Sequence, residues 1–377
     1  MENNVERPEA IIKVFGIGGG GSNAVNRMTA EGMQGVEFYV ANTDIQALKN
    51  SPVKNKIILG RETTGGLGAG ANPEIGRKAA EESEADIREA LLGADMVFIA
   101  AGLGGGTGTG AAPFFAKIAQ ELGILTVAIV TKPFRFERPK RMKDAESGLE
   151  ELSRYVDSLI VISNNNLLNV IGNKPISESF IACDNILRQG VQTITDLIAV
   201  PAMINLDFAD VKTTMEKKGK ALIGIGMSDG ENKAVEAAQK AIMSPLLDAN
   251  ISGAKSAIIN VTGGPGLTLF DAEAASDTIV DGAGGEIDVI YGLAINENLN
   301  DEVIVTVIAT GFEEEAKTNN IMKQFNDNED NTVKEINIMT SANHQSTTPV
   351  NEISKPKVNI EELQDDDNGV PNFFKRF

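Results

Sequence analysis

Hydrophobic and polar positions divide the first 160 residues into two kinds of segment. Short runs rich in β-branched residues are typical of buried strands, and longer stretches between them repeat apolar residues with helical spacing. The expected strands are 11–17, 36–41, 56–59, 96–101, 124–130 and 158–162, and the clearest expected helices are 73–92 and 111–122. Strict alternation of strand and helix predicts right-handed crossovers and a parallel sheet covered on both faces. We therefore expect a doubly wound α/β domain.

A long helix and a second unit follow this domain. Apolar positions repeat with helical spacing over 176–200, and Pro201 ends the pattern because proline cannot continue a helix interior. The expected strands beyond it are 221–226, 256–262, 286–294 and 302–309, with helices at 232–243 and 271–280. The last two strands are joined by a short polar link, so we expect a second sheet that is mixed or antiparallel.

The composition changes after residue 312. Residues 313–377 hold 13 acidic and 7 basic side chains and few apolar ones before Ile360. Such a segment buries too little apolar surface to offset its ordering entropy, and we expect most of it to be disordered. The final residues are different and include Val370, Pro371, Phe373, Phe374 and Lys375. They are typical of a short docking motif at the end of a tether, and the alternative is a tail with a few stray apolar residues.

Composition excludes several classes of function. The chain has 34 basic and 53 acidic side chains and a net charge of -19, which argues against binding to a nucleic-acid backbone. A single cysteine, Cys183, and a single histidine, His344, exclude an internal disulfide and the usual zinc sites. We see no apolar run of the roughly 18 residues that a membrane span needs and no secretory leader, so we expect a cytoplasmic protein without direct membrane insertion. The chemistry must rest on carboxylates, backbone amides and a hard metal ion.

The first glycine-rich loop follows the first expected strand. Gly16, Gly18 and Gly21 form a GxGxxG pattern at a strand-to-helix turn, where glycine allows close approach of the backbone to a pyrophosphate. Asp44 ends the next strand, where a ribose-binding acid belongs. Alone, these features fit a nicotinamide dehydrogenase, and a tight glycine turn without a ligand is the structural alternative.

Two further glycine-rich loops favour a triphosphate. The sequence GGGTGTG at 104–110 leads into an expected helix, and GGLGAGAN at 65–72 precedes another helix with Pro73 in its first turn. Loops after parallel strands lie along one sheet edge, where ligands bind. The chain has no GxxxxGK[ST] pattern, so the phosphates would be held by amides, helix dipoles and Mg²⁺.

Several stretches of the sequence, the glycine-rich loops among them, resemble those of a known protein family. GGGTGTG is typical of the tubulin superfamily, and residues 11–312 resemble the FtsZ family of bacterial cell-division GTPases. The matching stretches are GGGGSNAVNRM (18–28), ANTD (41–44), GLGAGANPEIG (66–76), GADMVFIAAGLGGGTGTGAAP (93–113), CDNILRQGVQ (183–192) and NLDFADV (205–211).

The resemblance implies a tubulin-like fold of class α/β. A Rossmann-type, parallel-sheet GTPase domain would be joined by a long core helix to a second α/β domain with a mixed sheet, followed by a disordered C-terminal tail. The expected parts are a flexible N-terminus (1–10), a GTP-binding domain (11–175), a central linking helix (176–201), a C-terminal α/β domain (202–312), a disordered acidic linker (313–360) and a partner-docking tail peptide (361–377).

The same resemblance implies the nucleotide-binding residues. Those around the phosphates would be Gly19, Gly20, Gly21, Ser22, Asn23, Ala69, Gly70, Ala71, Asn72, Gly104, Gly105, Gly106, Thr107, Gly108 and Thr109. Glu137 and Arg141 stand where the family contacts ribose and phosphate, although Arg138-Pro139 replaces a more usual glycine-containing pair. Asn164 would be a further contact.

Asp184 is the expected reader of the base. It shares one face of the long helix with Phe180, so its carboxylate can accept from guanine N1–H and N2–H₂ while the ring packs on the base. Adenine offers no matching pair of donors. The alternative is a surface aspartate above a core phenylalanine.

The segment 205–210 contains the candidate catalytic residues. Asp207 could be a helix N-cap with Asp210 at the third helical position. The resemblance implies a second role, in which Asp207 and Asp210, with Asn205 beside them, enter the nucleotide pocket of the next subunit and polarise the attacking water. Both interpretations can hold at once.

A site shared in this way implies a head-to-tail homopolymer. GTP is the expected substrate and GDP the product, with Mg²⁺ held mainly through the phosphates and water. The tail resembles a family peptide that binds membrane tethers and regulators of the division ring. The remaining alternatives are a Rossmann dehydrogenase and a nucleotide-binding structural protein without turnover.

Overall fold

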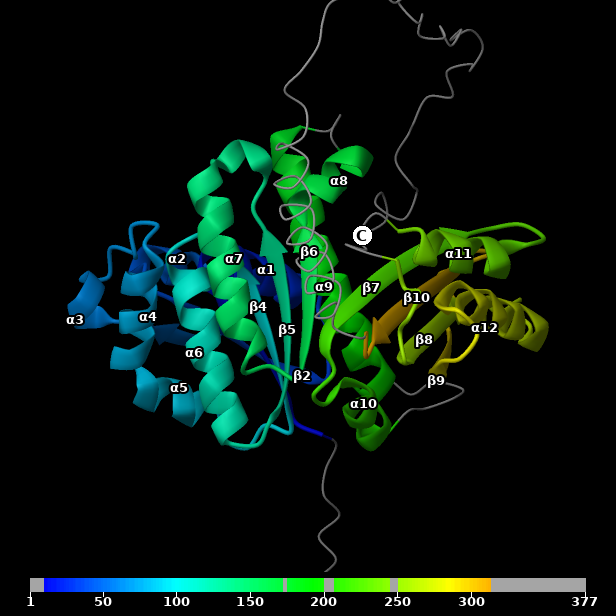
Figure 1. Cartoon of the computed structure of the whole chain (residues 1–377), viewed down its shortest axis with the longest axis horizontal. Helices are drawn as coiled ribbons and strands as arrows, with labels where there is room; N and C mark the ends of the chain where they lie inside the picture. The colour runs from blue at the N-terminus through cyan, green and yellow to red at the C-terminus, as the bar shows by residue number, and fades with distance from the viewer. Residues whose placement is uncertain (1–9, 172–174, 200–206, 245–249, 313–377) are drawn as a thin grey trace, which may run out of the picture. The chain divides into compact units, whose positions relative to one another are not determined.

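The structure (Figure 1) is a computed structural model that describes residues 10–171, 175–199, 207–244 and 250–312. Asn205 and the tail residues from 313 onward lie outside the described residues, as does the side chain of Phe180. The strands are β1 (Ile12–Ile17), β2 (Val36–Asn42), β3 (Asn55–Ile58), β4 (Met96–Gly102), β5 (Leu125–Lys132), β6 (Ser158–Ser163), β7 (Gly219–Ser228), β8 (Ser256–Gly263), β9 (Asp288–Ile295) and β10 (Val303–Thr310).

The helices connect these strands in the expected alternation. They are α1 (Gly18–Ala30), α2 (Ile45–Asn50), α3 (Arg61–Thr64), α4 (Pro73–Glu82), α5 (Glu84–Leu91), α6 (Thr107–Glu121), α7 (Pro139–Ser153), α8 (Asn164–Ile171), α9 (Ile176–Ala199), α10 (Phe208–Met215), α11 (Lys233–Ile242) and α12 (Leu269–Ala283), with a 3-10 turn η1 (Arg135–Glu137). None of the helices in the described ranges is long and apolar enough to cross a membrane.

All described strands belong to one sheet in the order β3-β2-β1-β4-β5-β6-β7-β10-β8-β9. Strands β1 to β6 pair in parallel, which confirms the doubly wound first half. Three residue pairs, from Ser158↔Gly219 to Ile160↔Ala221, join β6 to β7 and so extend the sheet into the second half. There β10 runs antiparallel to both β7 and β8, whereas β8 and β9 are parallel, so the second part is mixed, as expected, but it continues the first sheet instead of forming a second one.

Two apolar layers cover the faces of the parallel part, because residues in β1 and β4 alternate between them. Val14 and Phe98 face the layer that contains α1 and α9, whereas Phe15 and Ile99 face the layer of α4 to α7. A third cluster lies under α11 and α12. The parallel strands are buried on both faces, as their nearly continuous hydrophobic sequence predicts.

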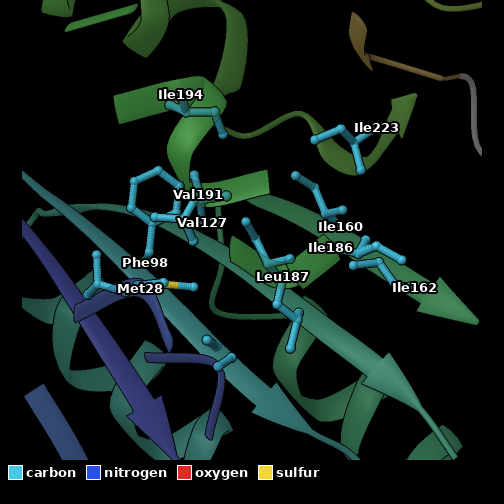
Figure 2. Packing of buried hydrophobic residues seen from close by; sticks show 14 of the residues in the cluster. Met28, Phe98, Val127, Ile160, Ile162, Ile186, Leu187, Val191, Ile194 and Ile223 are labelled. Carbon is cyan, nitrogen blue, oxygen red and sulfur yellow. The ribbon is translucent and has the colours of Figure 1, made fainter. Parts of the chain in front are cut away.

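Helix α9 packs across the junction between the two halves of the sheet. Figure 2 shows Val191 and Ile194 of α9 among Val127, Ile160 and Ile223, which come from β5, β6 and β7. Gly190 permits this approach, since a Cβ atom there would lie 3.2 Å from Cδ1 of Ile129 and 3.7 Å from that of Ile223. The long helix is therefore a core element, as the sequence predicts.

Two helix predictions differ from the structure. The single helix expected over 73–92 is wrong: α4 ends at Glu82 and α5 begins at Glu84. Between them the buried Ser83 accepts a hydrogen bond from Gly60 N (3.0 Å) and donates one to Ile58 O (3.3 Å), which ties this point of the chain to the turn after β3. Helix α6 begins at Thr107 rather than at residue 111, so the end of the second glycine loop forms its first turn.

Candidate functional site: a cradle of three glycine-rich loops

The structure brings the three glycine-rich loops together beyond the carboxyl ends of the parallel strands. A Cβ atom on Gly18 would lie 2.7 Å from Gly108 N, so the loop after β1 touches the first turn of α6. A Cβ atom on Gly106 would lie 2.9 Å from Asn72 N, so the same turn touches the loop before α4. The third loop follows the short helix α3 rather than a strand, but it reaches the same edge.

Glycine is required where these backbones meet. A Cβ atom on Gly21 would lie 2.1 Å from Ala100 O, which is too close for any side chain. Beyond the neighbouring backbone, a Cβ atom on Gly19 would meet no atom of the described residues within 4 Å, and one on Gly105 would meet only Arg141 Nη2, at 3.8 Å. The loops are thus pressed together on the sheet side and open toward solvent, where a ligand can approach the backbone.

Two helices begin at this cradle with their amide groups available. In the described structure, neither α1 nor α6 has a side-chain cap or an acidic residue in its first turn. The first amides of a helix have no intrahelical acceptors and carry the positive end of the helix dipole. The cradle therefore has the chemistry of an anion site for several phosphate oxygens.

Hydrogen bonds of threonine hydroxyl groups hold the glycine-rich loops in place. Thr43, just after β2, and Thr107 form a buried hydrogen bond of 2.7 Å between their hydroxyl oxygens. Thr109 accepts a hydrogen bond from Gly104 N at 2.8 Å. Thr43 belongs to the ANTD stretch, but no pattern in the sequence predicts its contact with Thr107. Asp44 beside it caps α2 by accepting from Gln46 N (2.8 Å).

Glu137 and Arg141, which the resemblance implies as ribose and phosphate contacts, lie beside the cradle. Arg141 forms an ion pair with Glu137, and its Nε donates to Gly104 O at 3.2 Å. The intervening Arg138 has φ +87°, a region that favours glycine. The backbone at Arg138 thus has a conformation that glycine adopts more easily.

The two candidate asparagines occupy different environments. Asn164 begins α8 at the carboxyl end of β6 and is buried, yet its Oδ1 has no hydrogen-bond partner within the described part of the chain. Its neighbour Asn165 accepts from Arg135 N at 2.9 Å, which places this turn next to η1. Asn23 is exposed on α1. An unsatisfied buried acceptor beside a binding cradle suits a ligand donor.

Asp184 lies on α9 across from α1. Its Oδ2 is 3.7 Å from Nη2 of Arg27, a residue that the sequence analysis does not single out. Burial raises the pKa of Asp184 to about 6, and the Arg27 guanidinium opposes this shift. Burial also raises the pKa of the neighbouring Cys183 thiol to about 12, which favours the neutral thiol over the thiolate near pH 7.

Asp207 and Asp210 lie far from the cradle in the same chain. Asp207 caps α10 by accepting from Asp210 N (2.8 Å), and Asp210 accepts from Asp207 N (3.3 Å) in return, which is the capping arrangement considered from the sequence. The other end of α10 contacts the amino edge of the sheet, where Ser158 Oγ donates to Met215 O at 2.6 Å. The glycine loops are at the carboxyl edge, so about one strand length (~20 Å) separates them from this end of α10.

The described residues contain no cluster of three side chains that could hold a metal ion by itself. A divalent cation at the cradle would therefore take its oxygen ligands from phosphates and water, with the hydroxyl groups of the loops nearby.

Comparisons with known proteins agree with this arrangement. Residues 11–172 match the model for the Tubulin/FtsZ family, GTPase domain, and residues 219–313 match the model for the FtsZ family, C-terminal domain. The chain is similar to an empty FtsZ dimer from M. jannaschii at 44% identity and a TM-score of 0.78, over 81% of this chain and 89% of that chain.

A more distant structure shares the fold. CetZ2 from Haloferax volcanii, solved as a GTPγS-bound protofilament, is 22% identical with a TM-score of 0.70, over 85% of this chain and 99% of that chain. The family models and the extensive similarity at 44% identity show that the chain belongs to the FtsZ family of the tubulin superfamily and carries its GTPase domain.

Proposed function

We propose that this protein binds GTP in the glycine cradle and hydrolyses it only at the contact between two subunits. One observation carries the proposal: α10, which begins with the Asp207–Asp210 pair, lies at the amino edge of the sheet (Figure 1), whereas the cradle lies at the carboxyl edge. A single subunit therefore holds the phosphates without catalytic acids and holds the acids without phosphates. Phosphoryl transfer requires mainly positioning and charge neutralisation, so a site divided between two subunits is chemically sufficient.

Different residues around the cradle would bind the phosphates, the ribose and the base of the nucleotide. The three glycine loops would hold the phosphates through backbone amides, with Mg²⁺ bound through phosphate oxygens and water. Glu137 and Arg141 would contact ribose and phosphate, and the unsatisfied Oδ1 of Asn164 would accept from the nucleoside. Asp184 would accept from guanine, and Asn23 would be a further contact. From the next subunit, Asp207 and Asp210, with Asn205 beside them, would orient the attacking water.

The arrangement supports head-to-tail assembly. A contact that joins the cradle edge of one subunit to the acidic edge of the next is heterologous, and it produces a filament when its rotation does not close. The FtsZ dimer and the CetZ2 protofilament are assemblies of related chains. We infer a dynamic filament of the bacterial division ring, in the cytoplasm at mid-cell, whose lifetime depends on the bound nucleotide.

We further propose that residues 369–377 dock onto membrane tethers and regulators of the ring. Aromatic residues next to Lys375 and Arg376, at the end of a long polar segment, form a suitable short peptide motif. Deletion of 369–377 should leave GTP hydrolysis and filament formation intact and abolish tether binding. A pull-down in which the truncated chain captures division-ring tethers as well as the full chain would refute this role.

Phosphate release and light scattering, measured together on the purified protein, test the central proposal. We expect GTP with Mg²⁺ to increase both signals, and turnover per molecule to rise with protein concentration because the site requires two subunits. Turnover independent of concentration would reject the shared site. Binding of NADH instead of GTP, followed by its fluorescence, would indicate a dehydrogenase, and GTP binding without phosphate release would indicate a structural protein.

A further inference from the structure

Two ion pairs join α1 to α9, and the cation comes from the α1 side in one pair and from α9 in the other. Arg27 of α1 faces Asp184 of α9 at 3.7 Å, and one turn further along both helices Glu31 faces Arg188 at 2.9 Å. Helix α1 begins with the first phosphate loop, and α9 carries the candidate base-reading carboxylate. The two ion pairs therefore connect the helix that begins at the cradle to the helix that carries Asp184.

The ion pair between Arg27 and Asp184 leaves hydrogen-bonding positions on both side chains free for a ligand. At 3.7 Å it exceeds hydrogen-bond distance, and the Nε of Arg27 has no hydrogen-bond partner in the part of the chain that the structure describes. The side chain of Asp184 is 18% exposed and that of Arg27 is 29% exposed. An ionised carboxylate offers about four acceptor positions, so Asp184 can accept two donors from a base while Arg27 stays beside it.

The charge on Asp184 depends on few neighbours. Burial raises its pKa to about 6, and Arg27 from α1 is the cation that opposes this shift. The next cation along α9, Arg188, is paired with Glu31, and the Cys183 thiol is neutral because burial raises its pKa to about 12. Glu137 contributes negative charge near Cys183. Arg27 is therefore the group that favours the ionised form of Asp184.

We propose that Arg27 is a positioning residue for nucleotide specificity: through its ion pair across the two helices it keeps the Asp184 carboxylate ionised, so that the pocket distinguishes guanine by its 2-amino group. This role rests on the proposed function of the cradle. An ionised carboxylate accepts from both N1–H and the 2-amino group of guanine. In a protonated carboxyl group one oxygen carries the proton and acts as a donor. The group can then accept a hydrogen bond from only one of these two guanine donors. Hypoxanthine has N1–H but no 2-amino group, so the preference for GTP over ITP reports the ionisation of Asp184.

The test measures the affinity of nucleotide-free protein for GTP and for ITP between pH 5.5 and 8.0. We expect the wild type to prefer GTP down to about pH 6 and to lose this preference below. In Arg27→Gln and Arg27→Met the loss should occur at higher pH, because the cation that lowers the pKa of Asp184 is gone. At pH 6.5 their preference should be about tenfold weaker than in the wild type, the effect of one hydrogen bond to a charged group.

Two controls separate this role from helix packing. Arg27→Lys keeps the charge and should restore the wild-type pH profile. Glu31→Gln breaks the neighbouring ion pair between the same two helices and should leave the preference for GTP unchanged. Thermal unfolding identifies which of the two neutral variants is folded, and either one is sufficient.

The outcomes are distinct. A folded neutral variant with the wild-type profile would overturn the role of Arg27, as would a Glu31→Gln variant with the same shift. A wild type that binds GTP and ITP equally at every pH would instead reject Asp184 as the reader of guanine, and so part of the proposed function.

Discussion

At the scale of single residues, Asp207 and Asp210 combine a structural and a proposed catalytic role. Each carboxylate accepts a hydrogen bond from the backbone of the other, and both side chains are exposed at the start of α10. The capping role needs a hydrogen-bond acceptor, whereas a role in polarising water at a phosphate needs the charge. The two roles are therefore separable by removing the charge alone.

Asp207→Asn and Asp210→Asn make this separation. Asparagine caps helices about as well as aspartate, so the free energy of unfolding should change by less than about 1 kcal/mol. GTP binding should persist, because both residues lie away from the cradle of their own chain. Phosphate release should fall by about 100-fold or more, as expected when a group that stabilises or orients the transition state is lost. Release at the wild-type rate in Asp210→Asn would refute the shared site.

The sequence predicts some residues of the site and not others, for a physical reason. The glycines of the cradle form local patterns, since a phosphate loop is built from consecutive residues at a strand-to-helix turn. Arg27 and Thr43 give no such signal, because their partners Asp184 and Thr107 lie on other elements. Only the folded chain brings them into contact.

At the scale of elements, strand positions follow from the hydrophobic pattern because buried strands are compact apolar runs. Their neighbours are less predictable. Strands β9 and β10 are consecutive along the chain, yet β8 lies between them in the sheet. The break between α4 and α5 was also missed, because the hydrogen bonds of Ser83 to residues 58 and 60 interrupt a helical pattern that is continuous in the sequence.

The contact between α4 and α6 provides a test at this scale. A Cβ atom on Gly110 would lie 2.0 Å from Pro73 O and 2.6 Å from Arg77 N, so Gly110→Ala must separate the two helices. We expect the free energy of unfolding, measured with urea, to fall by about 1–3 kcal/mol. GTP affinity should fall as well, since both helices begin in the cradle.

Gly266→Ala is the matched control for this substitution. No atom lies within 4 Å of the added Cβ atom, and Gly266 does not have a positive φ. Its effect on stability should stay within about 0.5 kcal/mol. Equal stability of the two variants would show that the close approach of α4 and α6 is not required.

At the scale of the whole molecule, the proposed division of the site would make each subunit incomplete in two independent ways. A chain can lose its pocket and keep its acids, or lose its acids and keep its pocket. Gly19→Asp should do the first, because the new side chain meets no atom within 4 Å of its Cβ and places a negative charge against the phosphates. Asp210→Asn should do the second.

Mixing these two variants tests the proposed assembly directly. Each alone should release almost no phosphate, whereas an equal mixture should regain activity wherever an Asp210→Asn pocket meets the intact acids of a Gly19→Asp subunit. With random placement in a head-to-tail filament, roughly one contact in four is competent, so about a quarter of the wild-type rate is expected. Replacing the Gly19→Asp partner by the double variant Gly19→Asp/Asp210→Asn should abolish the recovery, because no subunit then supplies Asp210. If the two single variants co-sediment as mixed filaments and remain inactive, hydrolysis does not depend on an acid from the neighbouring subunit.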